Sequence, residues 1–315
     1  MSEQRVLVVE NPAYLHINLG RLAIERHDQK PVFILPEDIA VLCLEHHTIT
    51  VSVAVLRAMA EAGVAVLITD NRHLPCAMQL PLIGTGLDAG RLRQQIRLDN
   101  SEQRGLLWQQ IVSSKLHNQA YALRYLQAKG ALRLQRLAAQ VKPSDQGNLE
   151  AQAAKHYWRH WLSEDFQRSK QGAEDAINLR LNYGYAVLRA MIARSLVASG
   201  LNAALGLGHS NAGNGFNLVD DFIEPYRFLV EIQVATLSKT WQQPPEFNGV
   251  EKKQLLGFIS QSIRFPKQDM RLNSAIDASI ASFVRILEGK GSHLVFPEAL
   301  SEQTIWASMD GESCG

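Results

Sequence analysis

A change in hydrophobic pattern near residues 83–90 divides this chain into two parts of different structural class. Before it, short apolar runs with partial alternation and turn residues between them predict strands. These runs are Arg5–Glu10, Tyr14–Leu19, Leu22–Arg26, Pro31–Pro36, Ile39–Glu45 and Val64–Asp70. Helical spacing over Val53–Ala62, which ends at Gly63, predicts one helix among them. The dividing segment Ile83–Gly90 has three glycines in eight residues and is typical of a linker.

Beyond this segment the strand signals nearly vanish. Residues 91–140 are rich in Leu, Gln, Ala and Arg, which favour helices. A further helix is expected at Leu149–Leu162, with Asn148 as its N-cap. A second, at Asp175–Ser199, has few charges and should be buried. A third, at Leu218–Leu237, should be kinked by Pro225. We therefore predict an α+β fold: a small β-domain at residues 1–82 (a sheet or sandwich with one helix), a linker at 83–90, a larger all-α domain at 91–300 and a polar tail at 301–315. A length of 315 residues is consistent with about two domains.

The net charge of +1 conceals a strong local asymmetry. Residues 91–142 carry ten basic and two acidic side chains, while the segments on either side are acidic overall. Such a segment indicates a polyanionic partner, although a charge-rich helix taken alone is more often only a solvated face. Near-neutrality excludes a globally basic packager of nucleic acid, and 46% hydrophobic residues exclude an intrinsically disordered chain.

Cysteine spacing and the N-terminus indicate the compartment. Cys43, Cys76 and Cys314 are far apart and odd in number, without the spacing of a zinc site, so we expect no disulfide framework and a reducing, cytoplasmic environment. The first residues carry charges where a signal peptide needs an apolar core. The longest uncharged stretch, Ser195–Val219, is broken by Gly, Asn and His, so no membrane association is expected.

Three segments place polar residues where core residues would be expected. Glu150 lies in the first turn of a predicted helix, where a lone carboxylate is usually explained by the helix dipole alone. His209 follows a nearly charge-free helix and is preceded by glycines, which allow a backbone to approach a ligand closely; a surface histidine is the ordinary alternative. Asp221 and Glu224 are three residues apart and share one helix face, where a cation between them would relieve their repulsion. The structural alternative is a solvated acidic face paired with Arg227.

Together these side chains could hold a divalent metal ion. Carboxylate-rich ligation with one imidazole suits Mg²⁺ or Mn²⁺, and the imidazole favours Mn²⁺. Such an ion would polarise a phosphodiester oxygen and activate a hydroxyl group. Spacing alone leaves open whether the three segments converge.

As a set, the motifs around these residues resemble the CRISPR-associated integrase family, the metal-dependent DNA endonucleases that insert new spacers into CRISPR arrays. The wording of the last two motifs is closest to the type II branch, and the resemblance covers about residues 1–300. The matching segments are Glu150–Ala154 with Tyr157 and Trp158, Leu181–Leu188, Gly206–His209, Asn217–Arg227, Pro36–Ile39 and Ala65–Asp70.

The resemblance implies a β-domain that mediates dimerisation and an α-helical catalytic domain. It implies Glu150, His209 and Glu224 as ligands of Mg²⁺ or Mn²⁺, with Asp221 as a further acidic residue that is either an extra ligand or a water-mediated partner. The implied reaction is transesterification: the 3′-hydroxyl of a captured DNA fragment attacks a phosphodiester at the repeat boundary. The same site would nick branched DNA.

The implied partners are double-stranded or branched DNA, a second copy of the chain and a second CRISPR-associated adaptation protein. In type II systems an RNA-guided effector nuclease and a ring-forming DNA-binding accessory protein also take part. The basic segment 91–142 would contact phosphates without reading bases, so binding should weaken with salt.

Two other functions remain open. A metallophosphoesterase that acts on small esters is disfavoured because a small substrate needs no extended basic segment. A catalytically silent DNA-binding assembly subunit is disfavoured because it would not require Glu150, His209 and Glu224 together.

Overall fold

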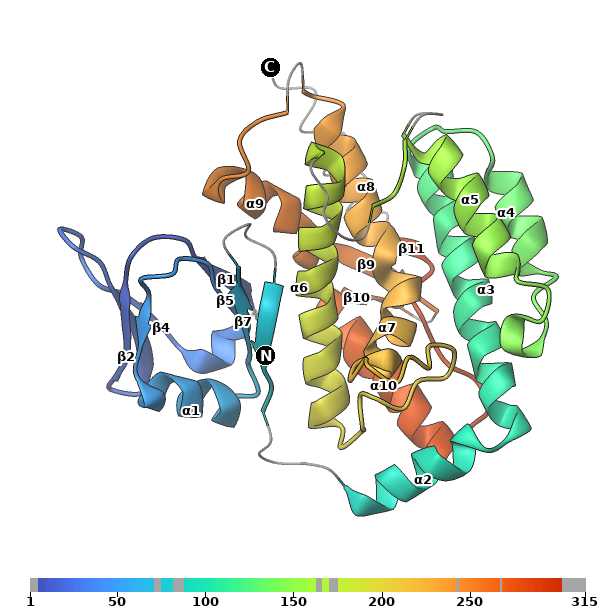
Figure 1. Cartoon of the computed structure of the whole chain (residues 1–315), viewed down its shortest axis with the longest axis horizontal. Coiled ribbons are helices and arrows are strands. Elements are labelled where there is room, and N and C mark those ends of the chain that lie inside the picture. The colour runs from blue at the N-terminus through green and yellow to red at the C-terminus, as the bar shows by residue number, and fades with distance from the viewer. Residues whose placement is uncertain are drawn as a thin grey trace.

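The computed structural model describes residues 5–70, 75–81, 88–162, 166–169, 175–241, 244–266 and 268–301 (Figure 1). The first sheet has the order β1-β5-β7-β8. Its three neighbouring strands β1, β5 and β7 are parallel, and β8 is antiparallel to β7 at the edge. The bounds are β1 (Arg5–Val9), β5 (Ile39–Leu44), β7 (Ala65–Thr69) and β8 (Pro75–Gln79).

The second sheet covers one face of the first. Its order is β4-β3-β2-β6, with β2 (Tyr14–Asn18), β3 (Arg21–Glu25), β4 (Val32–Ile34) and β6 (Thr50–Val51). Helix α1 (Val53–Glu61) packs against β2 and β7. Apolar side chains from both sheets and from α1, including Leu15, Ile24, Leu42 and Met59, form one buried cluster. The predicted β-rich region with one helix is therefore a small sandwich.

The helical region follows. Its helices are α2 (Ala89–Asp99), α3 (Glu102–Tyr125), α4 (Ala131–Ala138), α5 (Leu149–Trp161), α6 (Ala176–Ala198), α7 (Asn217–Ile223), α8 (Arg227–Ser238), α9 (Gly249–Leu255) and α10 (Leu272–Leu287). Short 3-10 turns occur at Pro36–Asp38, Pro143–Asp145, Glu224–Tyr226 and Leu256–Ile259. None of the helices in the described ranges is long and apolar enough to cross a membrane.

Helix α6 joins the two regions. It stands between the first sheet and the remaining helices (Figure 1), and it contacts β5, β7 and β8. Strand β5 is buried on both faces because Leu42 belongs to the core of the sandwich while Cys43 belongs to the core of the helices. A strand that is covered on both sides reads as a continuous apolar run, which explains the sequence IAVLCL.

The predicted α+β class, with a β-rich part followed by a mostly helical part, is confirmed. The helical part also contains a small antiparallel sheet that the pattern did not predict, with the order β10-β9-β11. Its strands are β9 (Ser262–Phe265), β10 (Gln268–Arg271) and β11 (Ala299–Leu300), so residues 91–300 are mostly rather than entirely helical. Most of the predicted linker at 83–90, the tail beyond Ser301 and Cys314 lie outside the described residues, while Cys43 and Cys76 are free thiols.

Candidate active site

Glu150 is presented by the first turn of α5. Asn148 occupies the N-cap position, but it adopts a left-handed conformation with φ of 48°, and the capping hydrogen bonds come from Asp145. The carboxylate of Asp145 accepts hydrogen bonds from the backbone N–H groups of Leu149 at 2.9 Å and Glu150 at 3.0 Å. Asn148 is thus the N-cap residue as predicted, but Asp145 makes the capping hydrogen bonds in its place. Because Asp145 satisfies the helix end, the Glu150 carboxylate is available for another partner.

Glu224 lies in the turn that Pro225 imposes between α7 and α8. Its side chain is only 5% exposed. Oε1 accepts a hydrogen bond from Arg227 at 3.0 Å, and Oε2 lies 2.5 Å from the Nζ of Lys115. Burial alone would raise the pKa of Glu224, but the charges of Arg227 and Lys115 outweigh burial and hold this pKa at about 2. Glu224 is therefore an ionised, buried carboxylate.

Lys115 connects the two carboxylates. Its ammonium group donates to Oε1 of Glu150 at 2.6 Å while it contacts Glu224. Burial would lower the pKa of Lys115, but the charges of Glu224 and Glu150 outweigh that effect and raise it. We had assigned Lys115 to the basic segment that contacts DNA; the structure corrects this, because the side chain is 8% exposed and points into the protein.

Asp221 and His209 form a second unit next to this cluster. Asp221 is fully buried on α7, and its carboxylate accepts hydrogen bonds from the backbone N–H groups of Leu207 and Gly208. Oδ1 also contacts the backbone N of His209 at 2.9 Å and the Nδ1 of its ring at 2.8 Å. The hydrogen bond with Asp221 raises the pKa of His209, and the charge of Glu224 adds to this effect. Asp221 thus holds His209 through Nδ1, and Nε2 is the other ring nitrogen of this half-exposed side chain.

The glycines of this loop serve packing. A Cβ on Gly208 would lie 2.3 Å from the Trp108 ring, and a Cβ on Gly206 would lie 2.9 Å from the Asp221 carboxylate. Trp108 in turn meets the His209 ring edge-on, with 5.7 Å between the ring centroids. We expected these glycines to admit a ligand; in the structure they admit a tryptophan and a carboxylate that fix the loop.

The sequence-predicted residues are brought together in two groups. Glu150 and Glu224 converge on Lys115, whereas Asp221 is used to hold His209. As the side chains stand, no group of three or more His, Cys, Asp or Glu residues in the described ranges forms a ready metal cluster. Asp221 therefore fits the role of a partner of His209 better than that of a metal ligand.

The donor set nevertheless fits a divalent cation. Oε2 of Glu224 is buried and, among the described residues, accepts no hydrogen bond of good geometry, although an ammonium group lies beside it. Glu150 and His209 are 27% and 39% exposed, so both can be reached from solvent. An imidazole whose Nδ1 is held by a carboxylate is the usual arrangement of a metal-binding histidine.

A buried network of hydrogen bonds and ion pairs around Glu231 holds Arg227, the partner of Glu224. The sequence patterns did not reveal it. Glu231 on α8 is fully buried and accepts hydrogen bonds from the hydroxyl groups of Tyr157 at 2.6 Å and Tyr185 at 2.7 Å. The guanidinium of Arg227 lies 3.9 Å from Glu231 and 4.3 Å above the Tyr185 ring. The spacing of Glu224, Arg227 and Glu231 by three and four residues is the signal that could have indicated one helix face.

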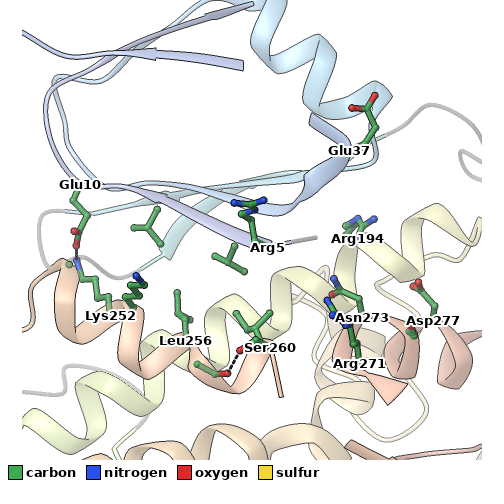
Figure 2. A pocket seen from close by; sticks show the side chains of 17 residues that line it. Arg5, Glu10, Glu37, Arg194, Lys252, Leu256, Ser260, Arg271, Asn273 and Asp277 are labelled. Atoms are coloured by element: carbon green, nitrogen blue, oxygen red, sulfur yellow. Dashed lines mark hydrogen bonds and ion pairs between the residues drawn. The ribbon is translucent and has the colours of Figure 1, made fainter. Parts of the chain in front are cut away.

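A separate cavity of 1310 Å³ lies between β1 and the helices α9 and α10 (Figure 2). Lys252 closes one end of it through an ion pair with Glu10 at 3.0 Å, and Arg5, Arg271 and Asp277 line it. Its lining residues include none of the four predicted site residues, so it is a different feature from the candidate active site.

Comparisons with known proteins agree with this architecture. Residues 6–257 match the family model of CRISPR associated protein Cas1. The CRISPR-associated endonuclease Cas1 of Neisseria meningitidis is 34% identical over 298 residues, which cover 94% of this chain and 96% of the relative. The chain belongs to the CRISPR associated protein Cas1 family. The predicted family is thus confirmed, and its type II branch fits the Neisseria relative.

Solved structures show the same fold. A casposase bound to an integration product superposes with a TM-score of 0.79 at 18% identity, covering 99% of both chains. A chain of a Cas6-RT-Cas1–Cas2 complex superposes with a TM-score of 0.69 at 17% identity, covering 93% of this chain and 36% of that chain.

Proposed function

We propose that this chain is a Mg²⁺- or Mn²⁺-dependent DNA endonuclease and integrase that joins captured DNA fragments to a CRISPR repeat as new spacers. The observation that carries the proposal is the convergence of Glu150 and Glu224 on one cation position. Membership of the Cas1 family, with curated relatives named endonucleases, supports it.

Glu150, Glu224 and the Nε2 of His209 would hold the metal ion, and Asp221 would keep the imidazole in the required orientation. When bound, such an ion neutralises charge on a phosphodiester and lowers the pKa of an attacking hydroxyl group. Arg227 pairs with Glu224 at 3.0 Å and would hold this ligand in position. Burial of Glu224 excludes water from its side of the site.

The proposed reaction conserves the number of phosphodiester bonds. The 3′-oxygen of the fragment forms a bond to phosphorus while a phosphorus–oxygen bond of the repeat strand breaks, and the hydroxyl proton passes in net to the leaving oxygen. No external energy source is therefore needed. Water in place of the 3′-hydroxyl gives nicking at the same site.

Exposed basic residues lie on α2, α3 and α4 and in the turns after α3 and α4. Of the ten basic residues in segment 91–142, seven are exposed: Arg93, Arg97, Arg124, Lys129, Arg133, Arg136 and Lys142. This number of exposed positive charges suits the phosphates of a duplex or branched DNA better than a small phosphate ester. One structural neighbour is described as bound to an integration product, which agrees with DNA as the substrate class.

The proposed partners follow the same line. By the register of the second sheet, Tyr14 on β2 and Phe33 on β4 lie on one face, and they are 46% and 45% exposed, so exposed aromatic side chains here suit a homodimer interface. A second adaptation protein, Cas2, is named with Cas1 in one structural neighbour, and we extend it to this chain. The RNA-guided effector nuclease and the ring-forming accessory protein complete the proposed assembly.

An integration assay with fragment DNA, a repeat-containing target and Mn²⁺ or Mg²⁺ tests the proposal. Glu150→Ala, His209→Ala and Glu224→Ala should each abolish joining while the fold stays intact. Glu102→Ala, an exposed acid in the first turn of α3, and His117→Ala, an exposed histidine on the same helix, are matched controls that should retain it. A wild-type chain that binds DNA but joins none would favour the silent assembly subunit; cleavage of small esters alone would favour the phosphoesterase.

A further inference from the structure

Lys115 occupies the place that a cation takes between two ligands. Its Nζ lies 2.6 Å from Glu150 on α5 and 2.5 Å from Glu224 in the turn before α8. Two buried or half-buried carboxylates that face a common point repel each other unless a positive charge lies between them. The ammonium group supplies that charge from a third element, α3.

We propose that Lys115 competes with the divalent metal ion for the same two carboxylates. It holds Glu150 and Glu224 together when no metal is bound, and it leaves them when the metal binds. Lys115 is in this sense a positioning residue. The release of Lys115 on metal binding rests on the proposed metal-dependent function. The role of Lys115 in the metal-free protein does not.

The two cations of the cluster differ in how firmly they are held. Arg227 is fixed by Glu224 at 3.0 Å, by the ring of Tyr185 and by Glu231. Lys115 is a point charge on a flexible stem, and the groups that it contacts are the two carboxylates themselves. When Lys115 leaves, Glu224 therefore keeps Arg227 as a counter-charge, and Glu150, which is 27% exposed, remains in contact with solvent.

Replacement of Lys115 should lower the stability of the metal-free protein and raise its affinity for metal. In Lys115→Met the metal-free carboxylates lose a counter-ion, so the melting temperature in EDTA should fall. Because the competitor is gone, Mn²⁺ should bind at least about tenfold more tightly in titration calorimetry, which equals about 1.4 kcal/mol. Saturating Mn²⁺ should bring the melting temperature back to within a few degrees of the wild-type value.

Lys252→Met is a matched control, because Lys252 is also buried between two carboxylates, Glu10 and Glu45. Its melting temperature should lie below that of wild type by the same amount in EDTA and in Mn²⁺, because the metal stabilises both chains equally. Arg124→Met, an exposed basic residue on the same helix as Lys115, should change neither quantity. Lys115→Gln keeps a hydrogen-bond donor without the charge and serves as a second variant if Lys115→Met does not fold.

Equal or weaker Mn²⁺ binding by the Lys115 variants would overturn the competition. Failure of the proposed metal-dependent function gives a different result: wild-type protein would bind no more Mn²⁺ than Glu150→Gln does. In that case the role of Lys115 as the counter-charge of the two carboxylates is still tested in EDTA. Glu150→Gln added to Lys115→Met should restore part of the lost stability, and a further loss would show that Lys115 does not balance the carboxylates.

Discussion

Two buried lysines in this fold each lie between two carboxylates, one at the candidate active site and one between the sheets and the helices. Lys252 on α9 reaches Glu10 at 3.0 Å and also pairs with Glu45, which directly follows β5. The hydroxyl of Tyr183 donates to the other oxygen of Glu45 at 2.5 Å. The cluster around Lys115 has the same composition of one lysine and two glutamates.

The surroundings of the two lysines differ. The ammonium of Lys252 lies 5.2 Å from the ring of Phe247 and 5.7 Å from that of Tyr183, and both oxygens of Glu45 have partners. Each cluster has one partly exposed carboxylate, Glu10 at 26% and Glu150 at 27%. The clusters differ at the buried carboxylate: at Lys115, Oε2 of Glu224 accepts no hydrogen bond of good geometry among the described residues, and an imidazole stands on the neighbouring loop. An unsatisfied carboxylate oxygen and a nearby imidazole, rather than exposure or residue type, therefore separate the functional cluster from the structural one.

The largest expected contrast is in DNA joining. Glu224→Gln removes a proposed metal ligand and should lower the joining rate by at least about a thousandfold, or about 4 kcal/mol. Glu45→Gln alters the Lys252 cluster and should leave the rate per folded molecule within about threefold of the wild-type rate. Single-turnover joining, normalised to the folded fraction from circular dichroism, measures both. Equal losses in the two variants would break the comparison.

The contrast also requires that Glu224 stays ionised although it is buried. Because its pKa is lowered to about 2, the ionised form stabilises the fold above the unfolded pKa of 4.5, and this contribution is lost as the pH falls toward 2. The difference in unfolding free energy between wild type and Glu224→Gln should be about 3 kcal/mol at pH 7 and less than half of that at pH 3. Urea unfolding at pH 7, 5 and 3 measures it. A difference that does not change with pH would show that the pair is not charged.

Asp221, which holds the imidazole beside the Lys115 cluster, has no counterpart in the Lys252 cluster. Asp221→Asn should lower Mn²⁺ affinity by about 10- to 100-fold, because the amide cannot hold the His209 ring as the carboxylate does. Titration calorimetry measures the change. His117→Ala serves as a control for the loss of an exposed imidazole. Wild-type affinity in Asp221→Asn would remove Asp221 from the support of the site.

Much of the fold could be predicted because its signals are local. Pro225 lacks a backbone N–H, and the predicted helix is interrupted there by the 3-10 turn Glu224–Tyr226. The run at Asp175–Ser199, which has few charges, is the buried helix α6. The strands β6, β8, β9, β10 and β11 were missed. Strands β6 and β11 have two residues each, and β8 (PCAMQ) and β10 (QDMR) contain no β-branched or aromatic residue.

The site was predictable only in part. The resemblance gave Glu150, His209 and Glu224, but nothing local distinguishes Lys115 from the other basic residues of its segment. Its hydrogen-bonding partner Glu150 lies 35 residues away, and packing alone brings the two together. For the same reason Asp145 was overlooked as the cap of α5, since it lies on the far side of a turn with left-handed residues. Contacts made across the fold leave no periodic trace in the sequence.

The smallest contrast comes from two tyrosines that lie two residues apart on α6. Tyr183 donates to Glu45 in the Lys252 cluster, and Tyr185 donates to Glu231, which lies 3.9 Å from Arg227 beside the candidate active site. Replacement of either by Phe removes one hydrogen bond to a buried carboxylate and should lower the unfolding free energy by about 1–2 kcal/mol. Only Tyr185→Phe should also slow joining, by about three- to tenfold, because Arg227 then holds Glu224 less firmly. Urea unfolding and the joining assay at saturating Mn²⁺ give the two quantities for each variant. If both variants slowed joining equally, the two carboxylate clusters would be coupled through α6, and the separation between a structural and a functional lysine would fail.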